Sequence, residues 1–281
     1  MNILPKISIV TPSYNQAEFL EKTITSVLDQ GYLCLEYIII DGGSTDGSVD
    51  IIKKYEKYLA FWVSEYDNGQ SHALNNGFRK CTGDLIGWQN SDDYYLPDTF
   101  NIVADVYQKI KADVYFGHQR IVDKNGNFIK DILFTPFSKF GHIYGSIAAT
   151  NQSMFWRRDV FEEWGYLDES LHYAMDYEWF LRLAESGACF HLIPKPLGCS
   201  RRHEKAKGGI KESQPKWIQE HKRIDAAYKI NRRLGSLFKI AALLRNTAIH
   251  VYQGDINDVL KNSERLHKHR KRTALKKDDK L

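Results

Sequence analysis

The sequence predicts an α/β protein with a mostly parallel sheet flanked by helices, followed by a helical and basic C-terminal extension. Apolar, strand-like runs alternate with helical patterns through residues 1–112, which is typical of a doubly wound parallel sheet. The chain has 281 residues and is 43% hydrophobic, so one large domain can bury a substantial core. We therefore expect an α/β domain over 1–213, with halves 1–112 and 113–213, and a helical extension over 214–281.

The first two strand–helix units bring polar loops to the ends of strands. The strand 7–10 is followed by the loop 11–15, and the strand 37–40 ends in Asp41 before the glycine-rich turn 42–47. Apolar residues recur at helical spacing after each loop: Phe19, Leu20, Ile24, Val27 and Leu28 in the first unit, and Val49, Ile51, Ile52 and Tyr55 in the second. Each unit therefore reads as strand, polar loop and helix.

The next two strands also end near carboxylates. Strand 61–64 leads to Asp67, and strand 85–88 leads to the adjacent Asp92 and Asp93. Because the carboxyl ends of parallel strands meet at one edge of a sheet, these polar residues should converge there: Asn15, Asp41, Asp67, Asp92 and Asp93. Paired carboxylates at such an edge suggest a divalent cation that bridges to phosphate. The alternative is a solvated acidic loop before the next helix.

The second half of the domain is less regular. Strands are expected at 114–116 and 154–156, with a hairpin turn at 123–127. Helices are expected over 97–111, 158–164 and 177–186. Asp176 lies just before the last of these helices, where its carboxylate could cap the helix N-terminus.

Composition and missing motifs exclude several classes of protein. The four cysteines form no CxxC pair, so we expect reduced thiols and a cytoplasmic protein. Residues 1–6 lack the apolar region of a signal peptide, and no later run has the length of a membrane span. The turn 42–47 contains neither GxGxxG nor GK[ST], which argues against dinucleotide and ATP binding.

The chain resembles the family 2 glycosyltransferases, which have the GT-A fold. Four segments carry the resemblance in order: 9–15, 39–47, 67–77 and 83–93. Further matching residues extend it over about three quarters of the chain: 155–158, 165–168, 175–182 and His203. The resemblance implies that 1–112 binds a nucleotide and 113–213 binds an acceptor.

The resemblance implies an inverting enzyme that moves a sugar from a nucleotide-diphosphate sugar, of the UDP-sugar type, to an acceptor hydroxyl. The residues expected to bind the nucleotide and donor sugar are Thr11, Pro12, Tyr14, Asn15, Asp41, Asp67, Asp92 and Arg202. Asp93 and His203 are expected to bind a metal ion, Mn²⁺ or Mg²⁺, which would stabilise the charge of the leaving diphosphate.

By the same resemblance, Asp176 matches the catalytic base that deprotonates the acceptor hydroxyl. The family often has an acidic residue directly before this aspartate, and here that position is Met175. A helix-capping role for Asp176 is compatible with catalysis.

The basic C-terminal extension has an expected role of its own. The segment 267–272 reads His-Lys-His-Arg-Lys-Arg, and Lys276 and Lys277 follow it. A solvated or disordered terminus is the default interpretation. Of two more specific hypotheses, attachment to an anionic membrane at its inner face, beside a glycan or lipid-linked acceptor, is favoured over nucleic-acid binding. The helices after Gln214 offer a surface through which two copies could pair.

Two other functions stay open from the sequence. A sugar-phosphate nucleotidyltransferase would carry a glycine-rich, Arg-bearing loop after the first strand, and the loop 11–15 is not of that kind. A non-catalytic nucleotide-sugar-binding protein would lack Asp93 or Asp176, and both residues are present. The favoured hypothesis is a glycosyltransferase of polysaccharide or lipid-linked glycan biosynthesis.

Overall fold

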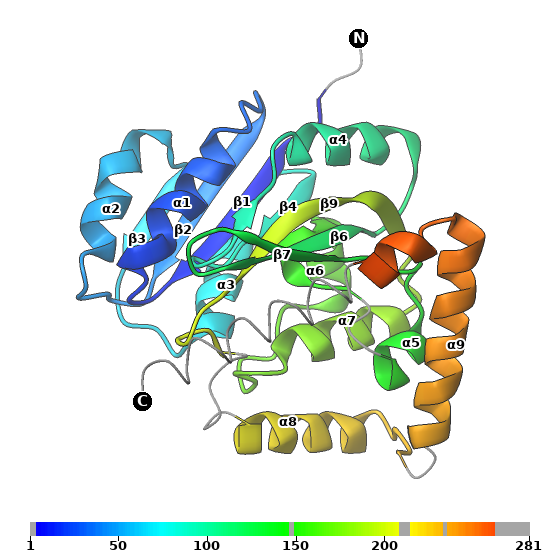
Figure 1. The fold of residues 1–281 in the computed structure, drawn as a ribbon. Helices are drawn as coiled ribbons and strands as arrows, with labels where there is room; N and C mark the ends of the chain where they lie inside the picture. The colour runs from blue at the N-terminus through cyan, green and yellow to red at the C-terminus, as the bar shows by residue number, and fades with distance from the viewer. Residues whose placement is uncertain (1–3, 146–148, 208–213, 233–234, 262–281) are drawn as a thin grey trace, which may run out of the picture.

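The computed structural model describes residues 4–145, 149–207, 214–232 and 235–261. A nine-stranded sheet runs through the molecule in the order β3-β2-β1-β4-β8-β6-β9-β5, with β7 paired to β6 (Figure 1). The strands are β1 (Ile7–Ser13), β2 (Leu35–Asp41), β3 (Phe61–Ser64), β4 (Leu85–Trp88), β5 (Tyr94–Tyr95), β6 (Val114–Asp123), β7 (Phe128–Ile132), β8 (Met154–Arg157) and β9 (Phe190–Arg202). The α/β class predicted from the sequence is confirmed.

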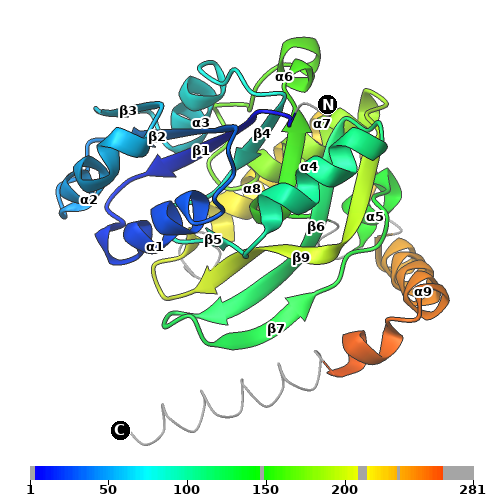
Figure 2. The same cartoon turned by 90° about the horizontal axis from the view of Figure 1, so that it is seen from above.

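Helices cover both faces of the sheet (Figures 1 and 2). They are α1 (Ala17–Leu28), α2 (Ser48–Tyr55), α3 (Gln70–Phe78), α4 (Thr99–Lys109), α5 (Lys139–Tyr144), α6 (Asp159–Trp164), α7 (Met175–Glu185), α8 (Gln214–Ala227) and α9 (Gly235–Gln253), with short 3₁₀ turns η1 (Glu56–Tyr58) and η2 (Asn151–Ser153). The apolar residues of α1, α2 and α4 pack on one face of the sheet, and those of α3, α6 and α7 pack on the other. Successive strand residues serve opposite faces, as Ile9 and Val10 do in β1.

The sheet is parallel in its first half and mixed in its second. Strands β3, β2, β1 and β4 pair in parallel, as the strand–helix alternation predicts. Beyond them, β8 is antiparallel to both β4 and β6, while β9 runs parallel to β6. The antiparallel pairs join the second half to the first in one curled sheet.

The long strand β9 is absent from the elements that the sequence pattern predicts. It contains Pro194, Pro196 and Gly198, which are residue types that strands usually avoid. The pairing of β9 with β6 tolerates them through register shifts at Gly117 and His118. A Cβ added at Gly117 would lie 2.4 Å from the Leu197 side chain, so the two strands approach closely only because this residue is glycine.

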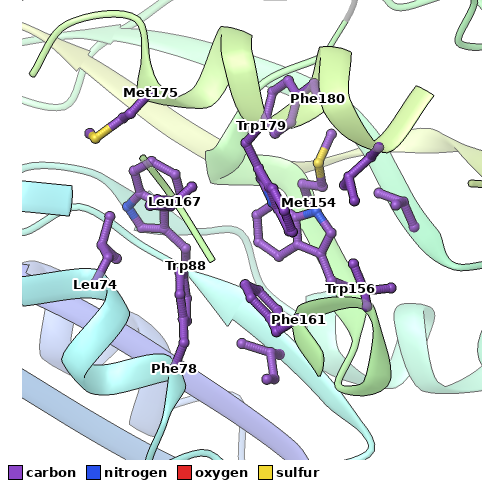
Figure 3. Close-up of a cluster of buried hydrophobic side chains, with 14 of the residues drawn as sticks. Leu74, Phe78, Trp88, Met154, Trp156, Phe161, Leu167, Met175, Trp179 and Phe180 are labelled. Carbon is purple, nitrogen blue, oxygen red and sulfur yellow. The ribbon is translucent and has the colours of Figure 1, made fainter. Parts of the chain in front are cut away.

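The larger core cluster lies between the sheet and α3, α6 and α7 (Figure 3). Trp88 from β4, Trp156 from β8 and Trp179 from α7 are all almost fully buried there. The Phe161 ring stacks on Trp179 at 5.4 Å between ring centroids. This cluster fixes α7 against the sheet, and α7 begins next to Asp176.

The helix α8 is packed onto this cluster and is not a detached appendage. Ile224 of α8 is buried in the cluster, and the Tyr228 hydroxyl donates a 2.6 Å hydrogen bond to Glu178 of α7. These contacts cross the predicted domain boundary at 213/214, which stays a prediction. The predicted basic segment 267–272 lies outside the described residues.

Two further expectations concern the state of the cysteines and the presence of membrane-spanning helices. All four cysteines are free thiols, as expected. Among the described helices, none combines the length and apolar character needed to cross a bilayer.

Candidate active site

A cleft of about 1760 Å³ opens at the carboxyl ends of the parallel strands. It exceeds the roughly 300–1,000 Å³ of ordinary small-molecule pockets, so it has room for two substrates. Of the residues that the sequence predicts for the site, these line it: Pro12, Tyr14, Asp67, Asp92, Asp93, Asp176, Arg202 and His203. Thr11, Asn15 and Asp41 do not line it. The fold thus brings most of the predicted residues to one cavity.

The two adjacent carboxylates after β4 lie in different environments. The Asp93 carboxylate is buried and accepts hydrogen bonds from the Arg201 backbone N–H (2.9 Å), Gln152 Nε2 (2.8 Å) and Asn90 Nδ2 (3.1 Å). The Asp92 side chain is 19% exposed and approaches His203 Nε2 at 3.0 Å. Asp93 is therefore held by the protein, while Asp92 faces the cleft.

Burial and the neighbouring charge of Asp92 raise the pKa of Asp93 to about 7. The three hydrogen bonds to Asp93 act in the opposite direction but do not outweigh burial. A cation in the cleft would favour the ionised form of Asp93.

His203 and Arg201 tie the end of β9 to this carboxylate pair. The His203 side chain is only 3% exposed, and its ring lies 4.5 Å from the Phe19 ring. Arg201 donates from Nε to the Asp92 backbone carbonyl at 3.0 Å, and its guanidinium lies over the Phe19 ring at 5.0 Å. The unpredicted strand β9 is thus what carries His203 to Asp92.

Asp176 occupies the first turn of α7 and lines the same cleft. Its Oδ1 accepts a hydrogen bond from the Tyr177 backbone N–H at 2.7 Å, and burial raises the pKa of its carboxyl above the usual value. The segment before it is held by Glu220 of α8, whose carboxylate accepts the backbone N–H groups of three residues at 2.8–2.9 Å: His172, Tyr173 and Ala174. Negative charge at a helix N-terminus is favourable, so Glu220 stabilises the start of α7.

Asp41 lies behind the wall of the cleft and organises the turn after β2. Its carboxylate accepts bonds from the Ser44 N–H (2.8 Å), the Ser44 hydroxyl (2.6 Å) and the Ser64 hydroxyl (2.7 Å). Asn15, which has a positive φ of 51°, accepts a bond from the Thr45 N–H at 2.9 Å. The Thr11 and Tyr37 hydroxyls are 3.0 Å apart in the core. The expected contacts of Thr11, Asn15 and Asp41 with a nucleoside stay predictions.

On the same side, Tyr14 and Asp67 do reach the cleft. The Tyr14 side chain is well exposed, which leaves its ring available for contact with a ligand. Asp67 accepts the Gly69 N–H at 2.7 Å, and a Cβ added at Gly42 would lie 2.7 Å from Asp67 Oδ2. Only glycine at position 42 therefore lets this carboxylate lie against the backbone.

The donor groups around Asp92 suit a divalent cation that takes most of its ligands from elsewhere. The buried Nδ1 of His203 has no hydrogen-bond partner, and the Asp92 carboxylate is accessible. Within the described part of the chain, no three His, Cys, Asp or Glu side chains gather into a complete metal site. The set fits a cation coordinated mainly by a diphosphate. The three hydrogen bonds to Asp93 leave one of the about four lone-pair positions of its carboxylate, on Oδ1, with which it could join this set.

Two cleft residues from α8 were not predicted as site residues. From α8, Trp217 and His221 face the cleft with ring centroids 3.9 Å apart, and His221 lies 4.4 Å from the Tyr177 ring. Lys207 donates to Gln70 Oε1 at 2.7 Å and so links the segment after β9 to α3. The helical, polar pattern after Gln214 gave no signal that α8 would fold back over the cleft.

The sheet topology, with the cleft at the carboxyl ends of its parallel strands, is that of the GT-A fold. The chain belongs to glycosyl transferase family 2, whose family model matches residues 8–175. Chondroitin synthase of Escherichia coli is 28% identical over 192 residues, which cover 67% of this chain and 28% of that protein. An uncharacterized glycosyltransferase of Mycobacterium tuberculosis, Rv1514c, is 30% identical over 192 residues, which cover 66% of this chain and 71% of that protein.

The chain spans 28% to 39% of the length of the first three curated relatives it matches. Among solved structures, TarS 1–349 of S. aureus in complex with UDP-GlcNAc has a TM-score of 0.61 at 16% identity and covers 95% of this chain and 92% of its own. The mannosyltransferase PcManGT from Pyrobaculum calidifontis, in complex with GDP-Man and Mn²⁺, has a TM-score of 0.57 at 15% identity, covering 94% of this chain and 88% of its own. At these identities, the likeness shows the fold.

Proposed function

We propose that this glycosyltransferase moves a sugar from a nucleotide-diphosphate sugar, of the UDP-sugar type, to an acceptor hydroxyl with inversion at the anomeric carbon. The acceptor is a growing polysaccharide or a lipid-linked glycan. The observation that carries the proposal is that one cleft is lined both by the carboxylates after β4 and by Asp176 of α7. The nucleotide-sugar complexes of TarS and PcManGT, which share the fold, support the donor class.

In this proposal, the first half of the cleft binds the nucleotide and the donor sugar. The exposed Tyr14 ring packs on the base, Asp67 accepts hydrogen bonds from the nucleoside, and Asp92 contacts the ribose or donor sugar. Arg202 and Lys207 face the same cavity and supply positive charge toward the diphosphate. A bound Mn²⁺ or Mg²⁺ would stabilise the charge of the leaving diphosphate, and Asp92, Asp93 and His203 are the residues to hold it.

Asp176 is the proposed catalytic base. It accepts the proton of the acceptor hydroxyl while that oxygen forms a bond to the anomeric carbon and the bond from that carbon to the diphosphate breaks. A base with a raised pKa binds this proton more strongly than an ordinary aspartate does, which suits the role. Attack from the face opposite the leaving group inverts the anomeric carbon.

The aromatic residues from α8 lie on the acceptor side in this proposal. Trp217 is 47% exposed at the cleft, and its neighbour His221 contacts Tyr177, the residue after the base. Aromatic faces pack well on the C–H groups of pyranose rings, so Trp217 would support an acceptor sugar.

The test is a screen of UDP-, GDP- and dTDP-sugars with Mn²⁺, using release of the nucleoside diphosphate as the readout. We expect turnover with a UDP-sugar, loss of transfer in Asp176→Asn with donor binding retained, and loss of metal-dependent turnover in Asp93→Asn. Asp50→Asn, an exposed aspartate on α2, is the matched control and should behave like the wild type. Equal transfer by Asp176→Asn and the wild type would contradict the assigned base.

The same screen separates the two alternative functions. A sugar-phosphate nucleotidyltransferase would form nucleotide sugar from a nucleoside triphosphate and a sugar 1-phosphate, with release of pyrophosphate. A non-catalytic binding protein would bind a donor, as calorimetry would show, without turnover in any donor and acceptor set. Either result would replace the transfer proposal.

A further inference from the structure

Asp93 lies at the end of a chain of side-chain hydrogen bonds that begins at Lys207. Lys207 Nζ donates to Gln70 Oε1 at 2.7 Å, and Gln70 Nε2 donates to Asn90 Oδ1 at 2.8 Å. Asn90 Nδ2 then donates to Asp93 Oδ2 at 3.1 Å. The chain runs from an exposed lysine, through two half-buried amides, to a buried carboxylate. It therefore connects the segment after β9 with the carboxylate pair after β4.

The direction of every bond in this chain is fixed by groups that can only donate. The Lys207 ammonium has no acceptor, so Gln70 has to turn its Oε1 to Lys207 and its NH₂ group to Asn90. The indole N–H of Trp88, which is also only a donor, bonds to Asn90 Oδ1 at 2.7 Å. Asn90 therefore has to present its NH₂ group to Asp93, and Asp93 Oδ2 has to accept.

A second chain of side-chain hydrogen bonds ends on the same oxygen. Gln119 Nε2 donates to Gln152 Oε1 at 3.1 Å, and Gln152 Nε2 donates to Asp93 Oδ2 at 2.8 Å. The Arg201 backbone N–H donates to Asp93 Oδ1 at 2.9 Å. Both chains thus occupy Oδ2, and the lone-pair position left for a cation lies on Oδ1. Breaking either chain frees the carboxylate to rotate, which moves that position.

We propose that Gln70 is a positioning residue of the cation site, which passes the Lys207 hydrogen bond on through Asn90 and so holds Asp93 in place for the cation. Groups that orient a metal ligand contribute to the affinity for the metal. Aligned hydrogen bonds polarise one another, so the lysine charge at one end strengthens the bond to the carboxylate at the other. This inference rests on the metal-assisted transfer proposed above.

The alternative is that side chains around the cleft act on a bound cation through their charge alone. Gln70→Glu separates the two explanations. The new carboxylate still accepts from Lys207 but cannot donate to Asn90, so the chain is broken. By charge alone, an added carboxylate at the cleft would tighten the binding of a cation. Gln70 is the first residue of α3, where negative charge is favourable, so this variant should fold.

The experiment measures Mn²⁺ binding by the 281-residue chain in the presence of UDP, with electron paramagnetic resonance of the free Mn²⁺ as the readout. We expect Gln70→Glu to weaken Mn²⁺ binding by about tenfold. Gln70→Met, which removes both hydrogen bonds without adding a charge, should weaken it in the same direction. Gln16→Glu is the matched control: Gln16 also lines the cleft but lies outside the chain, so this variant should bind Mn²⁺ at least as tightly as the wild type.

Two further measurements test whether Gln70 acts through Asn90 on Asp93. In an Asn90→Ala background, Gln70→Glu should change the Mn²⁺ affinity by less than about twofold, because the intermediate group is gone. Without metal, hydrogen exchange at the Arg201 amide, which donates to Asp93, should be faster in Gln70→Glu than in the wild type. Thermal unfolding checks that all variants are folded.

The possible failures point to different parts of the argument. Mn²⁺ binding by Gln70→Glu that equals or exceeds that of the wild type would overturn the positioning role and leave the transfer proposal intact. An equal loss with and without the Asn90 side chain would also overturn it, because Gln70 would then act on the cation directly. Failure of the wild-type chain to bind Mn²⁺ with UDP would contradict the proposed metal site itself, and the positioning role with it.

Discussion

Asp176 combines two effects that an aspartate at the first turn of a helix can provide. The Tyr177 backbone N–H orients its carboxylate, and burial in the cleft raises its pKa. The expected helix-capping role is wrong, because α7 begins at Met175 with Ala174 at its N-cap position, so Asp176 lies inside the first turn. The raised pKa suits a general base.

The raised pKa of Asp176 gives a prediction for the pH dependence of transfer. The base has to be deprotonated to act, so kcat falls as the pH drops below its pKa. Because burial raises that pKa, the acidic limb should lie above the ordinary aspartate value of 3.8. Steady-state rates across pH, with donor binding measured separately, check this. Asp176→Asn should lower kcat by about 10²- to 10⁴-fold and abolish the limb, and an unchanged limb in that variant would assign the titration to another group.

Glu36 lies near the start of β2, at the end of the sheet opposite the cleft, and stabilises the fold there. Burial acts to raise the pKa of its carboxyl, but hydrogen bonds from Lys6, Ser8 and Thr82 outweigh burial and lower the pKa to about 2. A lowered pKa means that the ionised form stabilises the folded state. This stabilisation is complete above the ordinary glutamate value of 4.5 and is lost as the pH falls through about 2.

We predict that Glu36→Gln lowers the free energy of unfolding by about 2–3 kcal/mol at pH 7. The difference from the wild type should shrink as the pH is lowered from about 4.5 toward about 2. Urea unfolding at several pH values measures both quantities. Glu56→Gln, at an exposed glutamate in η1, is the control and should change stability by less than about 0.5 kcal/mol.

Among the secondary-structure elements, the pairing of α8 with α7 connects the C-terminal region to the candidate base. Glu220 of α8 accepts the three backbone N–H groups just before α7. A carboxylate that accepts several N–H groups contributes more than neutral hydrogen bonds do. The position of Asp176 therefore depends on a residue outside the segment 8–175 that the family model matches.

Replacing this carboxylate should loosen the start of α7. Glu220→Ala is expected to cost about 1.5–3 kcal/mol in stability and to speed hydrogen exchange at the amides of His172, Tyr173 and Ala174. Transfer should fall with it, while donor affinity stays near the wild-type value. Glu163→Ala, on an exposed glutamate of α6, is the control. Unchanged exchange at the three amides in Glu220→Ala would contradict the capping role.

For the molecule as a whole, the contacts of α8 argue that the folded unit extends beyond residue 213. Ile224 is buried in the core cluster, and Tyr228 and Glu220 bind α7. Removing residues 214–281 would leave a cavity at Ile224 and unpaired backbone groups before α7. We therefore expect the folded domain to be more stable with α8 than without it.

A chain that ends after residue 213 is predicted to have a melting temperature roughly 10 °C lower than a chain that ends after Lys261. The longer chain keeps Ile224, Tyr228 and Glu220 with all of their contacts. Differential scanning calorimetry of the two chains measures the difference. Equal melting temperatures would support the boundary at 213/214 that the sequence predicts.

The local pattern of the chain was sufficient to predict the parallel half of the sheet. The alternation of apolar runs with polar loops depends on neighbours in sequence. It predicts strands that lead to Asp41 and to Asp92, and the structure has β2 and β4 at these places. The rule that parallel strands end at one edge was sufficient to bring Asp67, Asp92 and Asp93 to one cleft.

Features that depend on long-range contacts could not be predicted in this way. The prolines of β9 conceal a strand that exists because β6 and β5 offer it partners, and that strand delivers His203. Likewise, nothing within α8 indicates that Glu220 would meet the backbone before α7. The sequence therefore specified the fold class and most of the residues around the cleft. Tertiary packing established which carboxylate is buried, which faces the cleft and which helix completes it, because burial and hydrogen bonding arise between segments far apart in the chain.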